Sequence, residues 1–181
     1  MASTLSATSR SAAFAAFVAD AEALAHDPHA IAERLRALLA RNDWLAPEDR
    51  RPGDDAYRQH VLHVSPGGRL SVVALVWRPG QRTPVHDHIA WCIVGVYRGV
   101  EHEIRYRLVE ERGERALLPV GSVEAHPGHV EALIPPAEDI HMVEAAGDDL
   151  TISIHVYGAD ISDRGTSILE RFDDVPVLTA A

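Results

Sequence analysis

The stretch Gly80-Gln-Arg-Thr-Pro-Val-His-Asp-His-Ile-Ala-Trp-Cys-Ile-Val-Gly-Val-Tyr-Arg-Gly99 decides how this chain folds. It holds two histidines, His86 and His88, between glycine and proline residues on one side and a β-prone run on the other. In an extended strand alternate side chains share a face, so both imidazoles point in the same direction. Two imidazoles on one face supply half of a metal site.

The spacing from Gly80 through His86 and His88 to Gly99 resembles the first sequence motif of the cupin superfamily. The chain departs from that motif at Cys92, where metal-binding cupins usually carry glutamate. The carboxylate of the common site with two histidines and one acid is therefore absent from its place. A third ligand has to come from another part of the chain.

The run from Pro135 to His141 resembles the second cupin motif, Pro-x-Gly-Asp-x-His, with Glu138 in place of the usual glycine. This resemblance implies that His141 is the third metal ligand. An isolated His-x-His pair is also compatible with two surface histidines on a strand, but a third histidine at the motif spacing favours the metal site. Three neutral imidazoles leave the charge of a divalent ion uncompensated, which favours an anionic ligand such as a thiolate.

Composition indicates one soluble globular domain that acts on small molecules. The chain has 181 residues, of which 46% are hydrophobic and 24% charged, and its formal net charge is -10. Such an acidic chain offers no basic surface to nucleic acid and would be repelled by anionic membranes. Its one cysteine excludes an intrachain disulfide and fits a reducing compartment, so we expect a cytoplasmic protein. No apolar stretch is long enough to span a bilayer.

We expect residues 1–10 to form a flexible tail and residues 11–181 to form a single cupin domain. Apolar stripes predict helices over residues 11–25 and 28–41, and Asp27 is the expected cap in front of Pro28. Residues 42–56 are expected to be a connecting loop, and residues 159–181 form a C-terminal segment in which 168–172 is β-prone or helical.

The region from 57 to 158 is predicted to form the barrel. Its β-prone runs are 57–64, 70–77, 92–97, 101–108, 116–120, 129–134 and 150–157. Short strands at near-regular spacing, without helical patterns between them, are typical of a sandwich or a closed barrel. The predicted fold is therefore mainly β: a cupin double-stranded β-helix, or jelly-roll-like barrel, with the N-terminal α-helices packed outside.

The last strand of the predicted barrel has a polar face. Alternation places Ser153, His155 and Tyr157 on one side and three β-branched residues on the other. That polar side either faces solvent or lines a pocket, in which case a hydroxyl, an imidazole and a phenol could form a hydrogen-bond relay that ends near the metal.

Two sets of residues now resemble the cysteine dioxygenase family, the cupin-fold thiol dioxygenases, over roughly residues 57–158. One set, His86, His88 and His141, resembles the iron ligands of that family. The other set, Ser153, His155 and Tyr157, resembles its outer-shell triad. The resemblance implies Fe(2+) as cofactor, and a small thiol acid and dioxygen as substrates that give a sulfinate. It also implies that Tyr157, oriented by the other two triad residues, donates a hydrogen bond to bound oxygen or substrate.

The substrate prediction depends on fewer residues. Cysteine-specific members carry an arginine two residues after a tyrosine at the start of the barrel, and here Gln59 follows Tyr57 at that distance. Gln59 resembles the bacterial 3-mercaptopropionate dioxygenase branch. A thiol acid still needs a partner for its carboxylate. Our candidate is Arg164, with Arg171 behind it, although both depart in spacing from the arginine of that branch.

Several alternatives stay open at this point. The enzyme could be a cysteine dioxygenase, another iron cupin dioxygenase that acts on carbon, or a non-enzymatic cupin that binds a small molecule. In the mammalian family members a cysteine near the metal is cross-linked to the matching tyrosine. Cys92 lies close to that place, but we expect an ordinary buried strand cysteine.

Overall fold

The computed structural model describes residues 11–136 and 139–179, so the tail predicted for residues 1–10 and the motif position Glu138 lie outside the described residues. Two helices come first and strands follow. The elements are α1 (Ala12–Ala23), α2 (Pro28–Leu39), η1 (Pro47–Arg50), β1 (Arg58–Val64), β2 (Ser71–Trp77), β3 (His86–His88), β4 (Cys92–Arg98), β5 (Glu101–Glu111), β6 (Glu114–Ala125), β7 (Val130–Leu133), β8 (His141–Ala145), β9 (Thr151–Tyr157), α3 (Ile161–Arg164) and β10 (Ile168–Arg171).

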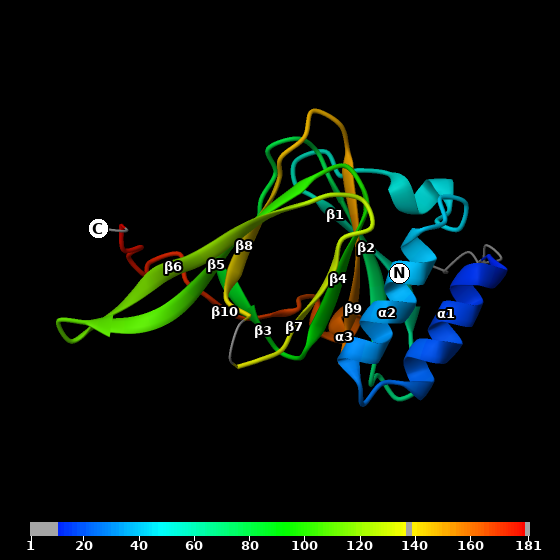
Figure 1. Ribbon diagram of the computed structural model, residues 1–181, viewed down its shortest axis with the longest axis horizontal. Helices are drawn as coiled ribbons and strands as arrows, with labels where there is room; N and C mark the ends of the chain where they lie inside the picture. The colour runs from blue at the N-terminus through cyan, green and yellow to red at the C-terminus, as the bar shows by residue number, and fades with distance from the viewer. Residues whose placement is uncertain (1–10, 137–138, 180–181) are drawn as a thin grey trace, which may run out of the picture.

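The strands form two antiparallel sheets that face each other (Figure 1). One sheet has the order β1-β2-β9-β4-β7, and the other has the order β10-β3-β8-β5-β6. Strands that follow one another in the chain are thus often in opposite sheets. This arrangement confirms the predicted fold, a mainly β cupin-type double-stranded β-helix with N-terminal helices outside it. Among the described residues, no helix combines the length and the apolarity needed to cross a bilayer.

Both long helices begin at side-chain caps that the sequence provides. The Ser11 hydroxyl accepts a hydrogen bond from the Phe14 amide at 3.2 Å. The Asp27 carboxylate accepts one from the Ala30 amide at 3.1 Å, and Pro28 occupies the first turn, as predicted. Each cap pairs an amide that would otherwise lack a partner within the helix, which stabilises the helix by about 1 kcal/mol.

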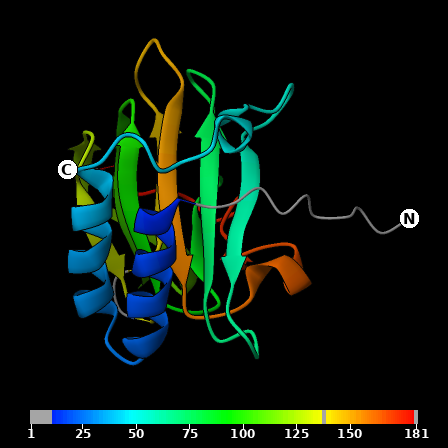
Figure 2. The ribbon, with the colours of Figure 1, turned by 90° about the vertical axis from the view of Figure 1, so that its right-hand side faces the viewer.

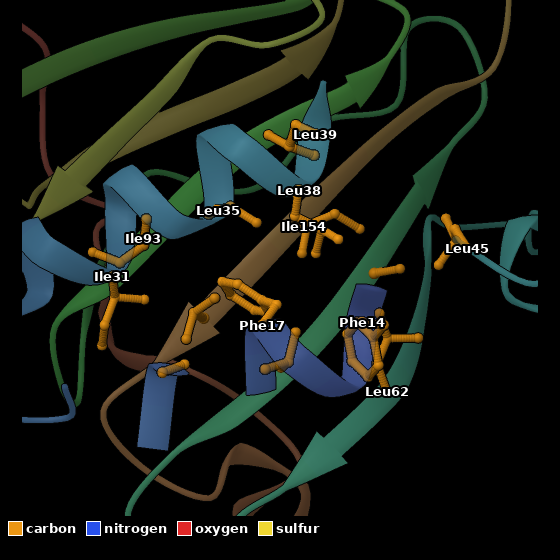
Figure 3. Close-up of a cluster of buried hydrophobic side chains, with 14 of the residues drawn as sticks. Phe14, Phe17, Ile31, Leu35, Leu38, Leu39, Leu45, Leu62, Ile93 and Ile154 are labelled. Atoms are coloured by element: carbon orange, nitrogen blue, oxygen red, sulfur yellow. The ribbon is translucent and has the colours of Figure 1, made fainter. Parts of the chain in front are cut away.

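The larger apolar core lies outside the barrel, between the helices and the outer face of the β1-β2-β9-β4-β7 sheet (Figure 2). Phe17 of α1 and Leu35 of α2 point toward Ile93 and Ile154 on the strands beneath them (Figure 3). Leu35, Ile93 and Ile154 are each 0% exposed. The helices therefore remove the outer face of this sheet from water, which leaves its inner face free to carry other chemistry.

The polar side of β9 faces the barrel interior, which decides between the two alternatives that the sequence left open. All seven residues of β9 are buried. Its apolar side, Ile152, Ile154 and Val156, belongs to the core under the helices. Its polar side consequently points the other way, between the two sheets.

Three strands, β5, β6 and β8, differ from the expected ranges. The strand β8 is absent from the predicted set, and β5 and β6 extend beyond 101–108 and 116–120 into a long hairpin that projects from the barrel (Figure 1). Arg112 and Gly113 connect them, both with positive φ (52° and 84°). Two such residues form the tight turn whose twist matches paired strands, so pairing continues to the hairpin tip.

Replacement of Leu35 by alanine should lower the free energy of unfolding by about 2–5 kcal/mol, because it leaves a cavity between α2 and the sheet. Urea denaturation measures this loss. The matched control is Leu169→Ala, at a leucine that is 66% exposed, which should change stability by less than about 0.5 kcal/mol. Equal losses in the two variants would contradict the assignment of this core.

Candidate metal centre

Three histidines from two neighbouring strands converge inside the barrel. His86 and His88 lie on the same face of β3, because alternate residues of a strand share a face. His141 begins β8 and pairs directly with His86 across the antiparallel ladder. Asp87, between the first two, points away and accepts a hydrogen bond from the Glu170 amide at 2.6 Å, which ties β3 to β10.

The three rings are close enough to share one ion. Their centroids lie 4.9 Å (His86–His88), 4.8 Å (His86–His141) and 5.0 Å (His88–His141) apart. One nitrogen from each ring lies within 4.8 Å of the others, and all three residues are at most 4% exposed. Three buried imidazoles with converging nitrogens fit a divalent transition metal, and they could hold one here.

Each ring has an acceptor beside its Nδ1 atom. For His86 this is the Pro84 carbonyl at 3.0 Å, and for His141 it is a carboxylate oxygen of Glu103 at 2.7 Å. His88 Nδ1 lies 3.6 Å from Asp139, which is longer than a hydrogen bond, but the same carboxylate accepts from the His88 amide at 2.9 Å. An acceptor at Nδ1 holds the proton there and leaves Nε2 with a free lone pair for a metal.

The carboxylate behind His141 belongs to a larger buried group. Arg105 donates to Glu103 at 3.0 Å and also to Glu131, which comes from β7 of the other sheet. Burial and the neighbouring Glu103 raise the pKa of Glu131 to about 7. These contacts link the two sheets directly beneath a metal ligand, so they fix the orientation of the His141 ring.

Two of the three histidines, His86 and His141, are neutral, as metal ligands must be. Burial, together with the other two imidazoles of the cluster, lowers the pKa of His86 to about 2. Burial also lowers the pKa of His141 well below its usual value. Protons therefore compete little with a metal ion for these nitrogens at neutral pH.

Ser153, His155 and Tyr157 form a continuous hydrogen-bond relay on the inner face of β9. The Ser153 hydroxyl lies 2.9 Å from His155 Nε2, and the Tyr157 hydroxyl lies 3.2 Å from His155 Nδ1. The Trp77 indole donates to Ser153 at 3.3 Å. Burial lowers the pKa of His155 to about 3 and raises that of Tyr157 well above its usual value, so both groups are neutral at physiological pH.

Cys92 lies opposite Tyr157 in the register between β4 and β9. Its sulfur is 3.8 Å from His155 Nδ1 and is hydrogen-bonded to the Tyr157 hydroxyl. The side chain is fully buried, and burial raises the pKa of the thiol. The sequence expectation of a buried strand cysteine is thus confirmed, and the thiol is protonated.

The histidine cluster and the relay open into one cavity of ≈ 320 Å³, a size that holds a small molecule. Gln59 lines this cavity, and so does Tyr57 two residues before it; the substrate contact of Gln59 stays a prediction. Other lining residues are Trp77, His155, Tyr157, Thr166, Ser167 and Ile168.

Arg164, the predicted partner of a substrate carboxylate, is exposed at the end of α3 and does not line the cavity. The next residue, Gly165, does line it. Burial raises the pKa of Tyr57, and the positive charge of Arg171 partly offsets this. The charge of Arg171 thus acts on one residue of the cavity wall, and Arg171 is itself paired with Asp173 at 2.8 Å. The binding role of Arg164 stays a prediction.

Sequence reasoning missed three residues of this region. Glu101 and Glu103 are each 3% exposed, although the run Glu101-x-Glu103-x-Arg105 has the alternation of a solvent-facing strand. The opposite face of β5 carries Ile104, Tyr106 and Leu108, so the sequence held no signal that the glutamate face lies inside. Ser167 lines the cavity and hydrogen-bonds Tyr157, but it lies in a loop that no periodicity describes.

No protein-family model matches the chain. Among solved structures, it is similar to the capsular polysaccharide assembling protein CapF of Staphylococcus aureus (22% identity, TM-score 0.44), over 58% of this chain and 29% of CapF. It is also similar to a protein with a double-stranded β-helix domain from Klebsiella pneumoniae (18%, 0.43; 65% and 90% covered). A third similar structure is an oxalate oxidase (14%, 0.46; 64% and 59% covered). None of these three names is that of a thiol dioxygenase, and the chain spans less than a third of CapF.

Replacement of Glu103 by glutamine should weaken metal binding about 10- to 100-fold, because the amide accepts less strongly from His141 and releases the ring. Isothermal titration of the metal-free protein with zinc measures the affinity. The control Glu110→Gln changes an exposed glutamate of the same strand and should leave the affinity unchanged. An unchanged affinity in Glu103→Gln would contradict the role of Glu103.

Proposed function

We propose that this protein is a non-haem iron thiol dioxygenase that converts a small thiol carboxylic acid, 3-mercaptopropionate, to its sulfinate with dioxygen. The observation that supports this most is the meeting of two independent groups at one cavity. The three-histidine cluster lies on the β10-β3-β8-β5-β6 sheet, and the relay that ends at Tyr157 lies on the facing sheet. A cavity that only held a ligand would not need a buried relay of neutral donors.

The residues that would hold iron are His86, His88 and His141. A ferrous ion held there would bring a thiolate and dioxygen together. In the overall reaction the S–H bond and the O–O bond of dioxygen break, two S–O bonds form and a proton is released. The electrons that sulfur loses are those that dioxygen gains, so the reaction needs no external reductant.

The chain itself contributes orientation and a hydrogen-bond donor. Tyr157 keeps its proton because burial raises its pKa, and its hydroxyl reaches the cavity. A fixed neutral donor stabilises negative charge that develops on oxygen or on the substrate headgroup. Trp77 and Leu75 cover the inner wall of the cavity and limit the access of water from that side.

The mouth of the cavity offers donors for a carboxylate. Tyr57, Gln59, Thr166 and Ser167 all line the cavity, and Gln59 and Thr166 are also exposed to solvent. We propose Gln59 as a direct contact, with Arg164 or Arg171 supplying the positive charge near the mouth. An amide at position 59 pairs with a carboxylate less strongly than a guanidinium does.

The iron-loaded wild type should consume one molecule of oxygen for each sulfinate formed, and its kcat/KM should be higher for 3-mercaptopropionate than for cysteine. Gln59→Arg should shift the ratio of the two kcat/KM values toward cysteine, on the order of 10-fold, because a guanidinium at that place pairs with the carboxylate bidentately. An oxygen electrode and chromatography of the sulfinates measure both quantities.

The alternatives give different results in the same assay. A higher kcat/KM for cysteine in the wild type would make the protein a cysteine dioxygenase. No oxygen consumption with any small thiol, despite full iron occupancy, would favour a cupin that only binds its ligand and would overturn the proposal.

Tyr157→Phe should lower kcat/KM on the order of 100-fold while the iron content stays unchanged, because the substitution removes one preorganised donor and no ligand. Steady-state kinetics and iron analysis of the same preparations test this. Tyr106→Phe, at a partly buried tyrosine of β5 that does not line the cavity, is the control and should retain wild-type activity. Full activity of Tyr157→Phe would rule out the donor role.

A further inference from the structure

Glu101 is a buried glutamate next to Ser153, the relay residue farthest along β9 from Tyr157. The proposed mechanism does not use it. Glu101 belongs to β5, in the sheet opposite the relay, and is 3% exposed. Its carboxyl group is hydrogen-bonded to Ser153. Its Oε1 atom has no hydrogen-bond partner in the part of the chain that the structure describes. Burial of a carboxyl oxygen without a hydrogen-bond partner lowers the stability of the fold, so such a group needs an explanation.

The Ser153 hydroxyl can serve its three partners in only two ways. A hydroxyl donates one hydrogen bond and accepts two. The Trp77 indole is only a donor, so it always takes one of the two accepting positions of Ser153. The other accepting position and the single donated bond are left for Glu101 and for His155 Nε2, which lies 2.9 Å away.

The proton on Glu101 decides between these two arrangements. A protonated carboxyl donates to Ser153, which must then donate to His155 Nε2. His155 consequently carries its proton on Nδ1 and donates to the Tyr157 oxygen at 3.2 Å, so Tyr157 directs its own proton away from His155, toward Ser167 or a molecule in the cavity. An ionised Glu101 accepts from Ser153, so every bond reverses and the Tyr157 proton turns inward to His155.

We propose that Glu101 is the fourth member of the relay and that the proton on its carboxyl group sets whether Tyr157 presents a donor or an acceptor to the cavity. Glu101 is a positioning residue, because it acts on the cavity through Ser153 and His155. The same cavity carries the proposed dioxygenase reaction, so the catalytic consequence of this inference rests on that function.

The surroundings of Glu101 keep both arrangements accessible. Burial raises its pKa to about 7, the bond from Ser153 opposes this, and the carboxylates of Glu103 on β5 and Glu131 on β7 add to the rise. Cys92 on β4 also faces it, and its thiol is uncharged. Below this pKa the carboxyl is protonated, and each hydrogen bond of the relay is donated in the direction from Glu101 to Tyr157. Above this pKa the carboxyl is ionised, and each bond is donated in the opposite direction.

The experiment reads the tautomer of His155 directly. Full-length protein labelled with ¹⁵N-histidine and loaded with zinc, which is diamagnetic, is studied by long-range ¹H–¹⁵N correlation between about pH 6 and about pH 9. We expect the Nδ1–H tautomer of His155 at the acid end and the Nε2–H tautomer at the alkaline end. Glu101→Gln has the same size but no titrating proton, so its tautomer should not change with pH.

Three further proteins make the result specific. Glu101→Leu removes the partner of Ser153, so both tautomers should be present together. Ser153→Ala removes the hydroxyl that connects Glu101 to His155. Adding Glu101→Gln to that variant should therefore leave the tautomer ratio of His155 unchanged. Glu110→Gln is the surface control and should behave as the wild type does.

Two outcomes would overturn the inference. One is a tautomer ratio that is the same, at every pH, in the wild type, Glu101→Gln and Glu101→Leu. The other is a pH-dependent switch that persists in Glu101→Gln, since another group would then drive it. Failure of zinc to bind would instead count against the metal centre, because the tautomer is read in the same way in the metal-free protein.

Discussion

The structure depends on the burial of both faces of one sheet. A strand such as β9 can carry a polar face inward only if its apolar face is covered on the outside, and α1 and α2 supply that cover. Apolar burial outside the barrel thus supplies the stability that a polar interior lacks. The barrel is then free to hold histidines, glutamates and hydroxyls between its sheets.

Polar groups in that interior are arranged so that most of them satisfy one another. Glu103 holds His141 and is itself held by Arg105, which also binds Glu131 from the facing sheet. On the other side, Ser153 connects Trp77 to His155. Buried networks of this kind fix side-chain orientation, because each hydrogen bond restricts the partner of the next. A metal centre gains precision from such fixed neighbours.

Much of the fold and the candidate centre could be predicted from period-two alternation and from motif spacing. The common face of His86 and His88 and the polar side of β9 are properties of single strands, which sequence expresses directly. Whether that polar side met water or a pocket was not predictable, since the answer depends on helices more than a hundred residues away.

Other features are not local and could not be predicted. The run from Glu101 to Arg105 resembles an exposed strand because its partners, His141, Glu131 and Ser153, come from three other strands. The loop that contributes Ser167 has no period, so its position against the cavity follows from the end of β9 and the pairing of β10 with β3. The exposed position of Arg164 is likewise set by the short helix α3 that ends at it, which no sequence period indicated.

The order of the elements along the chain has a consequence for synthesis. The helices that cover the outer face of β9 leave the ribosome well before β9 itself, which is the last strand of its sheet to be made. Until β9 inserts between β2 and β4, the helices have only part of their surface to pack on. The nascent chain therefore exposes apolar helix surface over most of its translation, a period in which binding by a chaperone would protect it from aggregation.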